Sequence, residues 1–208
     1  LGKYSFGELS YYLITKRRPT PGQLVMFEAV LASLADHGFT PTAIAARLTY
    51  ASAPDSLQGA LAAGLLGGGS RFLGVTEDCA HFLARELKEI GDAPTTQDGW
   101  DAAALNAVQK QRDIGKFVPG LGHPVHKQGD PRTPVLIAMA REQGLFGSHL
   151  SLFEAIGRVH AQVLGKTLPL NGAGVCGAVL ADAGIPMGVM RGVALLARCA
   201  GLLGHLVE

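Results

Sequence analysis

The sequence predicts an all-α protein, and three observations support that prediction. Apolar residues recur at helical spacing, for example at Leu24, Phe27, Leu31 and Leu34. No stretch shows the sustained period of two that indicates a half-buried strand. Proline and glycine residues stand where the periodic segments begin and end. We therefore expect helices joined by short turns, with one long ordered loop.

Start and stop signals define the expected helices. Thr20-Pro21-Gly22-Gln23 offers an N-cap, a proline at the first helical position and a capping-box glutamine, and Gly38 ends that helix. The segment Asp55–Leu66 is so small and apolar that we expect it to be buried on all sides. The other expected helices are Phe6–Ile14, one beginning at Pro41, Glu77–Ile90, Trp100–Gln111, Arg132–Gln143, Leu150–Leu164, Gly174–Ala183 and Pro186–Leu206.

Size, charge and hydropathy exclude several classes of partner. The 208 residues are 48% hydrophobic and 17% charged, which suffices for one sizeable core or a large domain with a smaller insert. The 18 basic and 17 acidic side chains give a net charge of +1, and the longest basic run is Lys16-Arg17-Arg18, so nucleic acid is not an expected partner. No apolar run reaches the roughly 18 residues that span a bilayer, so no membrane association is expected.

The cysteines and the N-terminus indicate a compartment. Cys79, Cys176 and Cys199 are far apart, odd in number and fit no metal-binding spacing, which favours reduced thiols in a cytoplasmic protein. The start, Leu1-Gly2-Lys3, has neither a signal peptide nor an initiator methionine. We therefore expect a cytoplasmic protein with further residues before Leu1.

A shift in composition predicts two domains. The segments before Gly69 and after about Gly177 are rich in Ala, Leu and Gly, whereas the middle is more polar and holds the single tryptophan, Trp100. We expect a discontinuous large domain (residues 1–72 and 176–208), a small domain (73–175), and a ligand between them. Glycine-rich hinges at 67–69 and 172–177 would suit closure.

The most informative stretch is the loop at residues 118–132. Its glycines and prolines exclude a regular helix and allow backbone N–H groups to approach a ligand. It also carries His123, His126, Lys127 and Arg132, a proton-transfer group beside several anion binders. This set indicates a site for a ligand with several carboxylates or phosphates. The alternative is a surface turn with incidental charges.

Two other sequence patterns resemble known binding sites but lack the surrounding features that those sites need. Gly172–Gly177 reads G-x-G-x-x-G, but no strand precedes it and no second strand follows, so a dinucleotide site is not predicted. His123 and His126 have Pro124 between them and lack a third ligand, so no metal site is predicted.

Two charged or titratable residues allow more than one interpretation. Arg198 stands in an otherwise apolar helix, where a buried guanidinium needs an anion, and Glu208, Asp182 or a bound carboxylate could supply it. His37 follows the expected second helix, where a histidine is also favoured simply by the helix dipole.

Taken in order, five segments resemble the citrate synthase superfamily across essentially the whole chain. The short length and the turn at 64–72 look most like short bacterial citryl-CoA lyase-like proteins and the citryl-CoA lyase module of ATP-citrate lyase. The resemblance implies an all-α homodimer with a large and a mobile small domain. Coenzyme A thioester and an oxaloacetate- or citrate-like acid would bind as substrates in the cleft, with no covalently held cofactor. The segments are Ala35–Gly38, Gly64–Phe72, Pro119–Arg132, Leu168–Asn171 and Arg198–His205.

The resemblance also implies residue roles. His123 would polarise the reacting carbonyl or alkoxide oxygen, and Ser70 and Asn171 would donate hydrogen bonds to a thioester oxygen. The family's enol-stabilising histidine falls on Ser70, and its catalytic aspartate falls on Ala173, which cannot accept a proton. Losing a positioned base typically costs about 10² to 10⁴ in rate. The remaining roles are carboxylate binding by His37, Arg132 and Arg198, and coenzyme A binding by Pro119, Gly120, Leu121, Gly122 and Lys127.

These roles lead to two functional hypotheses. The first is an enzyme of the citryl-CoA lyase or citrate synthase type, with His123 as its central acid or base, taking the citryl hydroxyl proton during cleavage. The alternative is a catalytically impaired protein that binds coenzyme A and a dicarboxylate; a third, weaker hypothesis is a different keto acid with a base from elsewhere. In each case we expect a dimer face built from the apolar helices of Leu24 to Leu66 and Val193 to Leu206.

Overall fold

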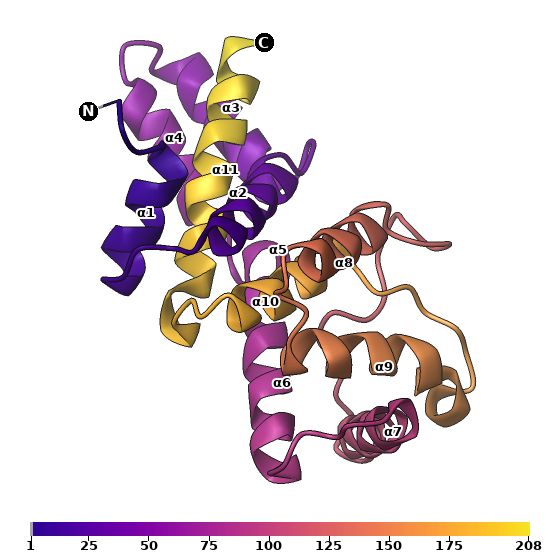
Figure 1. The fold of residues 1–208 in the computed structure, drawn as a ribbon. Helices are drawn as coiled ribbons and strands as arrows, with labels where there is room; N and C mark the ends of the chain where they lie inside the picture. Colours follow the sequence, from indigo (N-terminus) through magenta and orange to yellow (C-terminus); the bar gives the residue numbers. More distant parts are fainter. Residues whose placement is uncertain (1) are drawn as a thin grey trace.

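The protein is an all-α assembly, as predicted. The computed structural model describes residues 2–208, and about 70% of the chain is helical. Within those residues there is no β-strand, only an isolated antiparallel bridge between Leu121 and Leu170. The helices, shown in Figure 1, are α1 Phe6–Thr15, α2 Pro21–Ala35, α3 Pro41–Ser52, α4 Leu57–Leu66, α5 Ser70–Leu73, α6 Val75–Ile90, α7 Gln97–Asp113, α8 Arg132–Glu142, α9 Ser148–Leu164, α10 Gly172–Asp182, the 3₁₀ turn η1 Met187–Val189 and α11 Met190–Val207.

Local capping explains where several helices begin. The predicted capping box of α2 is confirmed, because Gln23 N donates to Thr20 Oγ1 (3.2 Å) and Thr20 N donates to Gln23 Oε1 (2.8 Å). Helix α10 begins at Gly172, two residues earlier than expected, because Asn171 caps it. The short α5 and the first turn of α6 were not predicted.

Helix α10 occupies the centre of the molecule. It packs on α2, α6, α8 and α9, and most of its residues are buried (Figure 1). Its glycines permit the close approach: a Cβ on Gly177 would lie 2.2 Å from the Thr76 carbonyl oxygen, and one on Gly174 would lie 2.5 Å from the Gly120 Cα. The G-x-G-x-x-G run is therefore a helix-packing surface.

Helices α1 to α5 lie with α11 on one side of α10, and α7 and α9 lie on the other (Figure 1). The main hydrophobic core continues across both groups, from Phe27 and Val30 of α2 to Leu150 and Phe153 of α9. The division at residues 72/73 and 175/176 into a large and a small domain stays a prediction.

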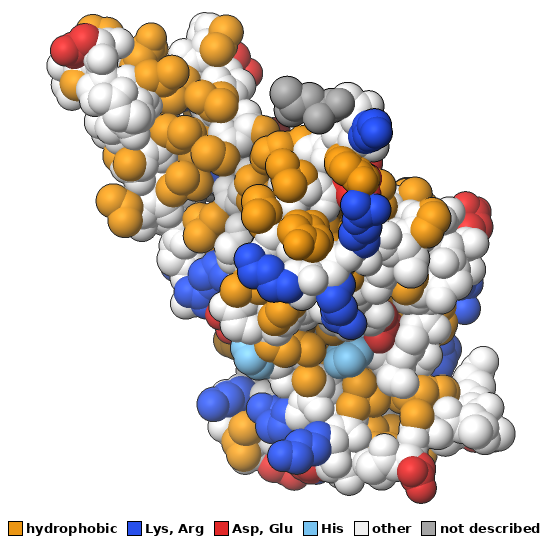
Figure 2. Space-filling view, turned by 60° about the vertical axis from the view of Figure 1, so that its left-hand side comes forward, with side chains coloured by type: hydrophobic (Ala, Val, Ile, Leu, Met, Phe, Trp, Pro, Cys, Tyr) orange, Lys and Arg blue, Asp and Glu red, His pale blue; other side chains and the backbone are white. Residues whose placement is uncertain are grey.

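The α3–α4 pair is less covered than expected. A small cluster built around Ala46, Ala60 and Leu202 joins these helices to α11. The outer face is bare: Leu48 is 67% exposed and Leu66 is 87% exposed. The prediction that Asp55–Leu66 is buried on all sides was therefore wrong for this single chain, because α4 contacts neighbours on one side only. Figure 2 shows hydrophobic side chains gathered over the upper part of the molecule.

By length and composition alone, the segment Met187–Val207 could cross a membrane, which the sequence analysis did not anticipate. In the fold it packs along α2, α3, α4 and α6. Arg198 lies buried within it, at 4% exposure. In total, 33% of the apolar window is buried inside the described fold.

Candidate active site

The loop between α7 and α8 is ordered by contacts to the segment before α10. Gly122 N donates to the Pro169 carbonyl (2.6 Å), and Asn171 N donates to the Gly120 carbonyl (2.9 Å). Gly120 has a φ of +82°, and a Cβ there would lie 2.7 Å from the Phe153 ring, so only glycine fits. The loop is therefore a fixed part of the fold, and the alternative of an incidental surface turn does not describe it.

Asn171 fastens this loop to α10 through its side chain. Its Oδ1 accepts from Gly174 N (2.8 Å) as the helix cap, and its Nδ2 donates to the Gly122 carbonyl (2.8 Å). The second hydrogen of Nδ2 is not used by these contacts. Asn171 thus positions the loop and can still donate one hydrogen bond into the adjoining cavity.

The hydrogen bonds of His123 define its tautomer. Its Nδ1 accepts from Val125 N (3.0 Å) and His126 N (2.9 Å), so in the neutral ring the proton is on Nε2. Burial, followed by the charge of the nearby His126, lowers the pKa of His123 below its ordinary value. His123 is therefore built as a neutral hydrogen-bond donor through Nε2. This geometry favours the donor role over the base role proposed for the cleavage direction.

Arg132, at the start of α8, is held by a carboxylate of its own chain. Its Nε and Nη2 donate to the two oxygens of Asp130 (3.0 and 2.8 Å), and its Nη1 donates to the Ser33 carbonyl (3.0 Å). Burial by itself would raise the pKa of Asp130, but hydrogen bonds from Arg132 and from Gly172 N outweigh it and hold that pKa well below its usual range. Asp130 therefore stays ionised, and it also lies 3.9 Å from His123 Nε2.

Arg198 has no such partner. Its Nε and Nη2 donate to the carbonyls of Leu34 and Ala35 at the end of α2, and its buried Nη1 has no hydrogen-bond partner within residues 2–208. Burial lowers the pKa of this guanidinium, opposed by the charge of Asp36. Carbonyl dipoles at a helix C-terminus favour a cation there but do not neutralise it.

The two side chains considered as partners of Arg198 are used elsewhere. Asp182 caps α9 by accepting from Gly147 N, His149 N and Leu150 N, and Glu208 pairs with Arg47. Of the three alternatives left open by the sequence, a bound anion is the one that agrees with these contacts.

His37 lies just beyond the end of α2. The Asp36 side chain accepts from His37 N (2.7 Å), which shapes this turn. His37 Nδ1 is buried without a partner in the described part of the chain, and its ring meets Phe72 edge-on. Burial, then the charge of Arg198, lowers the pKa of His37, so the ring is neutral near pH 7.

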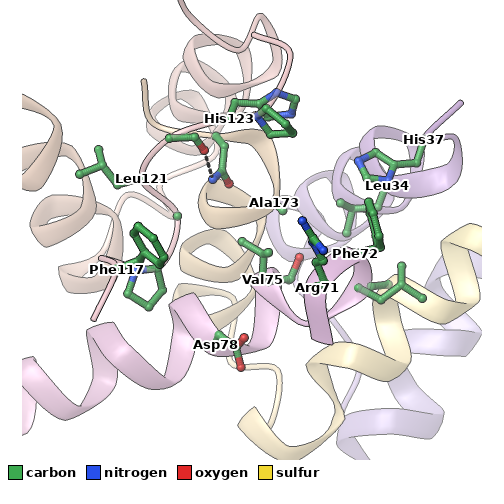
Figure 3. A pocket seen from close by; sticks show the side chains of 18 of the residues that line it. Leu34, His37, Arg71, Phe72, Val75, Asp78, Phe117, Leu121, His123 and Ala173 are labelled. Carbon is green, nitrogen blue, oxygen red and sulfur yellow. Dashed lines mark hydrogen bonds between the residues drawn. The ribbon is translucent and has the colours of Figure 1, made fainter. Parts of the chain in front are cut away.

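These groups line one cavity of about 690 Å³ (Figure 3). The structure brings together predicted residues from four separate parts of the sequence, and Ala173 forms part of the same wall. Ser70 is not part of that wall; it lies exposed at the start of α5, and its contact with a thioester stays a prediction. The predicted residues lining the cavity are His37, His123, Arg132, Arg198, Asn171 and Pro119–Gly122.

A second cavity, of about 800 Å³, adjoins the first across the loop. It contains Lys127 and three cations that sequence reasoning missed: Arg112, Lys116 and Lys166. Lys116 borders both cavities. Its position two residues before Val118 was a signal that could have included it.

The first cavity is strongly cationic. Arg71 and Lys116 join Arg132 and Arg198 in its wall, and among the described residues that line it Asp78 is the sole carboxylate. Arg71 was missed although it directly follows Ser70 in the recognised turn. An excess of fixed positive charge around a concave surface attracts a ligand with several negative charges.

The all-α fold thus places a cation-lined cavity beside an ordered loop. The chain belongs to the family described as citrate synthase, C-terminal domain, whose model matches residues 2–208. It is 26% identical to Citrate synthase 2 of Bacillus subtilis, over 99% of this chain and 52% of that protein. The chain thus spans about half the length of this curated relative.

Solved structures share the fold. The citryl-CoA lyase of Hydrogenobacter thermophilus superposes with a TM-score of 0.88 at 31% identity, covering 100% of this chain and 77% of the other. The ATP citrate lyase of Methanosaeta concilii superposes with a TM-score of 0.77 at 25% identity, covering 98% of this chain and 34% of the other. That lyase was solved as an aspartate-to-alanine variant in complex with (3S)-citryl-CoA. The resemblance seen in the sequence is confirmed at the level of fold and family.

Proposed function

We propose that the protein acts on a coenzyme A thioester and a C4 keto dicarboxylate, cleaving or forming a carbon–carbon bond in the manner of citryl-CoA lyase or citrate synthase. The observation that carries the proposal is the buried guanidinium of Arg198, which faces the same cavity as His37 and His123 and has no carboxylate partner among residues 2–208. A buried charge of this kind is stabilised when an anion binds.

Carboxylates of the acid would interact with Arg198 and His37, with Arg132 contributing its free N–H groups. Arg132 keeps Asp130 as its permanent partner, so its net charge toward the ligand is smaller than that of Arg198. His123 Nε2–H would donate to the keto or alkoxide oxygen at the reacting carbon. This arrangement supports binding of a dianion with its carbonyl facing the loop.

The thioester would lie against the loop backbone at Pro119–Gly122. Lys127, with Lys116, Arg112 and Lys166 in the adjoining cavity, offers positive charge for the phosphates of coenzyme A. The complex of the Methanosaeta concilii lyase with (3S)-citryl-CoA supports this class of ligand. Coenzyme A enters as part of a substrate and not as a bound cofactor.

In the cleavage direction the citryl hydroxyl loses its proton, the carbon–carbon bond breaks, and the acetyl carbon gains a proton. His123 Nε2–H would stabilise the oxygen that becomes the ketone, and Asn171 would donate to the thioester oxygen of the leaving enolate. The two protons exchange with water, so the net reaction consumes none. No residue in the wall near Ala173 serves as a base, because Asp130 is held ionised by Arg132 and its pKa is too low.

Incubation with citryl-CoA tests the proposal. We expect release of oxaloacetate and acetyl-CoA, abolished in His123→Ala. His81→Ala is the matched control, because His81 is an exposed imidazole on α6 that lines neither cavity. Turnover that survives His123→Ala, or that is lost equally in His81→Ala, would contradict the role of His123.

A second function is favoured by one observation, the methyl group of Ala173 in the reactive part of the cavity. A protein with intact anion-binding groups and no base would bind a coenzyme A thioester or dicarboxylate without turnover. Equilibrium binding of coenzyme A and oxaloacetate, with no product from citryl-CoA after long incubation, would assign this binding role.

We also infer a homodimer in the cytoplasm. The bare apolar faces of α3 and α4 support the dimer, and three free thiols suit a reducing compartment. Light scattering should give the mass of two chains, and Leu48→Glu should shift it to one, whereas the neighbouring Gln58→Glu should not. A single-chain mass for the unmodified protein would overturn the dimer.

A further inference from the structure

The wall at Ala173 has no proton acceptor among the described residues and combines apolar side chains with guanidinium groups. Figure 3 shows Ala173 between His123 on one side and Leu34 and Phe72 on the other, with the Arg71 side chain beside it. The Arg132 guanidinium packs against the preceding residue, where a Cβ on Gly172 would lie 2.4 Å from Arg132 Nε. The space beside Ala173 is thus bordered by cations that suit a carboxylate, and the described residues offer no base there.

No other carboxylate of the described chain replaces the base. Asp130, the acidic group next to this wall through its bond to Gly172 N, is fixed by Arg132, and these hydrogen bonds hold its pKa well below its usual range, so it is a weak proton acceptor. Asp78 lines the cavity from α6, and Figure 3 shows it on the far side of Val75 from Ala173. An acetyl thioester must lose a C–H proton to form its enolate. The described residues around Ala173 offer no base that would accept this proton efficiently.

We propose that the protein accepts a β-carboxy acyl thioester, such as malonyl-CoA, and forms the enolate by loss of carbon dioxide instead of by loss of a proton. This inference rests on the proposed function and names a substrate class for the same site. The additional carboxylate of such an acyl group would lie beside the guanidinium groups of Arg71 and Arg132, which favour its binding. Its departure as carbon dioxide leaves an electron pair on Cα, so the enolate forms without any residue that accepts a proton.

The step balances without any base. The bond between Cα and the free carboxylate breaks, carbon dioxide leaves, and the electron pair forms the thioester enolate. The free hydrogen of Asn171 Nδ2 donates to the enolate oxygen, and Cα attacks the keto carbon of oxaloacetate. His123 Nε2–H stabilises the resulting alkoxide, which takes one proton from water. The products are citryl-CoA and carbon dioxide, and no electron donor or acceptor takes part.

The test compares two thioesters on the full chain. Oxaloacetate is supplied with either acetyl-CoA or malonyl-CoA that carries carbon-13 in its free carboxyl group, and citryl-CoA and labelled carbon dioxide are measured by mass spectrometry. The label is needed because oxaloacetate, itself a β-keto acid, also loses carbon dioxide. We expect citryl-CoA from malonyl-CoA at least about 100-fold faster than from acetyl-CoA, since a positioned base is worth about 10² to 10⁴. One labelled carbon dioxide should accompany each citryl-CoA.

Two variants of Ala173 distinguish the effect of an added carboxylate from the effect of a larger side chain. Ala173→Asp should raise the acetyl-CoA rate about 100-fold or more and lower the malonyl-CoA rate, because two carboxylates would share one space. Ala173→Asn, of nearly equal size to aspartate but without a base, should lower the malonyl-CoA rate without the rise in acetyl-CoA rate expected for Ala173→Asp. Both introduce a polar residue in the first turn of α10, where it is tolerated.

The outcomes distinguish this inference from the proposed function. If coenzyme A and oxaloacetate bind and citryl-CoA is cleaved, but malonyl-CoA gives no product or reacts no faster than acetyl-CoA, decarboxylation is overturned and the proposed function stands. If neither coenzyme A nor oxaloacetate binds, both are overturned. Citryl-CoA formed without release of the label would also contradict the decarboxylation step.

Discussion

Two arginines in one cavity have opposite surroundings. Arg132 is paired through two hydrogen bonds to Asp130, whereas Arg198 rests on backbone carbonyls with one buried nitrogen unpaired. The first charge is neutralised inside the fold and mainly fixes the geometry of the loop and α10. The second is left for a ligand. A family likeness assigns both residues to the same carboxylates, and only the contacts show that their contributions differ.

The largest expected effect comes from removing the partner of Arg132. Asp130→Ala leaves a half-buried guanidinium and the N–H of Gly172 unpaired, and breaking such a pair costs about 3–5 kcal/mol in the free energy of unfolding. Urea denaturation measures the change. Asp78→Ala, which removes an exposed carboxylate from the same cavity, should change stability by less than about 0.5 kcal/mol. Equal effects in the two variants would erase the distinction between the arginines.

Replacing Arg198 should act on binding and not on stability. Arg198→Met is expected to weaken oxaloacetate binding by about 2–5 kcal/mol, because the ligand loses its uncompensated charge partner. The free energy of unfolding should stay the same or rise, since an unpaired buried cation gives way to an apolar chain. Titration calorimetry and urea unfolding measure the two quantities. Arg191→Met, on the same helix but outside both cavities, is the control, and a matching loss of binding there would refute the assignment.

A double-mutant cycle sharpens the contrast. Removing both Asp130 and Arg132, as in Asp130→Ala with Arg132→Met, should restore part of the stability lost in Asp130→Ala, with a coupling of about 0.5–3 kcal/mol. The same cycle between Asp130 and Arg198 should give a smaller coupling, because no hydrogen bond joins them. Additive losses for the first pair would mean that Asp130 does not neutralise Arg132.

The smallest effect concerns pH. The lowered pKa values of His37 and His123 mean that the unfolded chain binds protons at a higher pH than the folded chain does. Stability should therefore fall as the pH drops below about 6.5, the ordinary histidine pKa, towards the lower folded pKa values. His37→Gln should flatten this slope in urea unfolding at pH 7.5 and 5.5. A bound dianion should also flatten it, since it offsets the charge of Arg198 that contributes to the low pKa.

The sequence predicted well the helices whose first residues form a recognisable N-terminal cap. Thr20, Pro21 and Gln23 fix the start of α2 by local hydrogen bonds, so the prediction and the structure agree. Helix α5 was missed because residues 67–69 were interpreted as a hinge, and a four-residue helix has no periodicity to detect. The start of α10 was predicted two residues too late, at Gly174 instead of Gly172. The glycines that follow Asn171 are weak helix formers, so Asn171 was not recognised as the N-cap.

For the site, the resemblance named the residues that the fold brings together, but no spacing in the sequence could show how they are paired. Asp130 and Arg132 are two residues apart, which does not reveal a fork-like contact or the third bond to Gly172. Arg112 and Lys166 lie in no motif and reach the second cavity only through tertiary packing, whereas Arg71 lies in the recognised turn at 64–72. The unpaired state of Arg198 likewise depends on where Asp182 and Glu208 find other partners.

The contact between Gly174 and Gly120 reaches beyond packing. A Cβ on Gly174 would collide with the Gly120 backbone, and one on Gly120 would collide with the Phe153 ring, so helix and loop are held at one separation. Position 173 is carried by that same turn, and its Cβ therefore projects to a location set in advance of any side chain. Exchanging the one residue there should redirect the chemistry of the cleft without redesigning its scaffold, which makes this site a natural starting point for laboratory evolution.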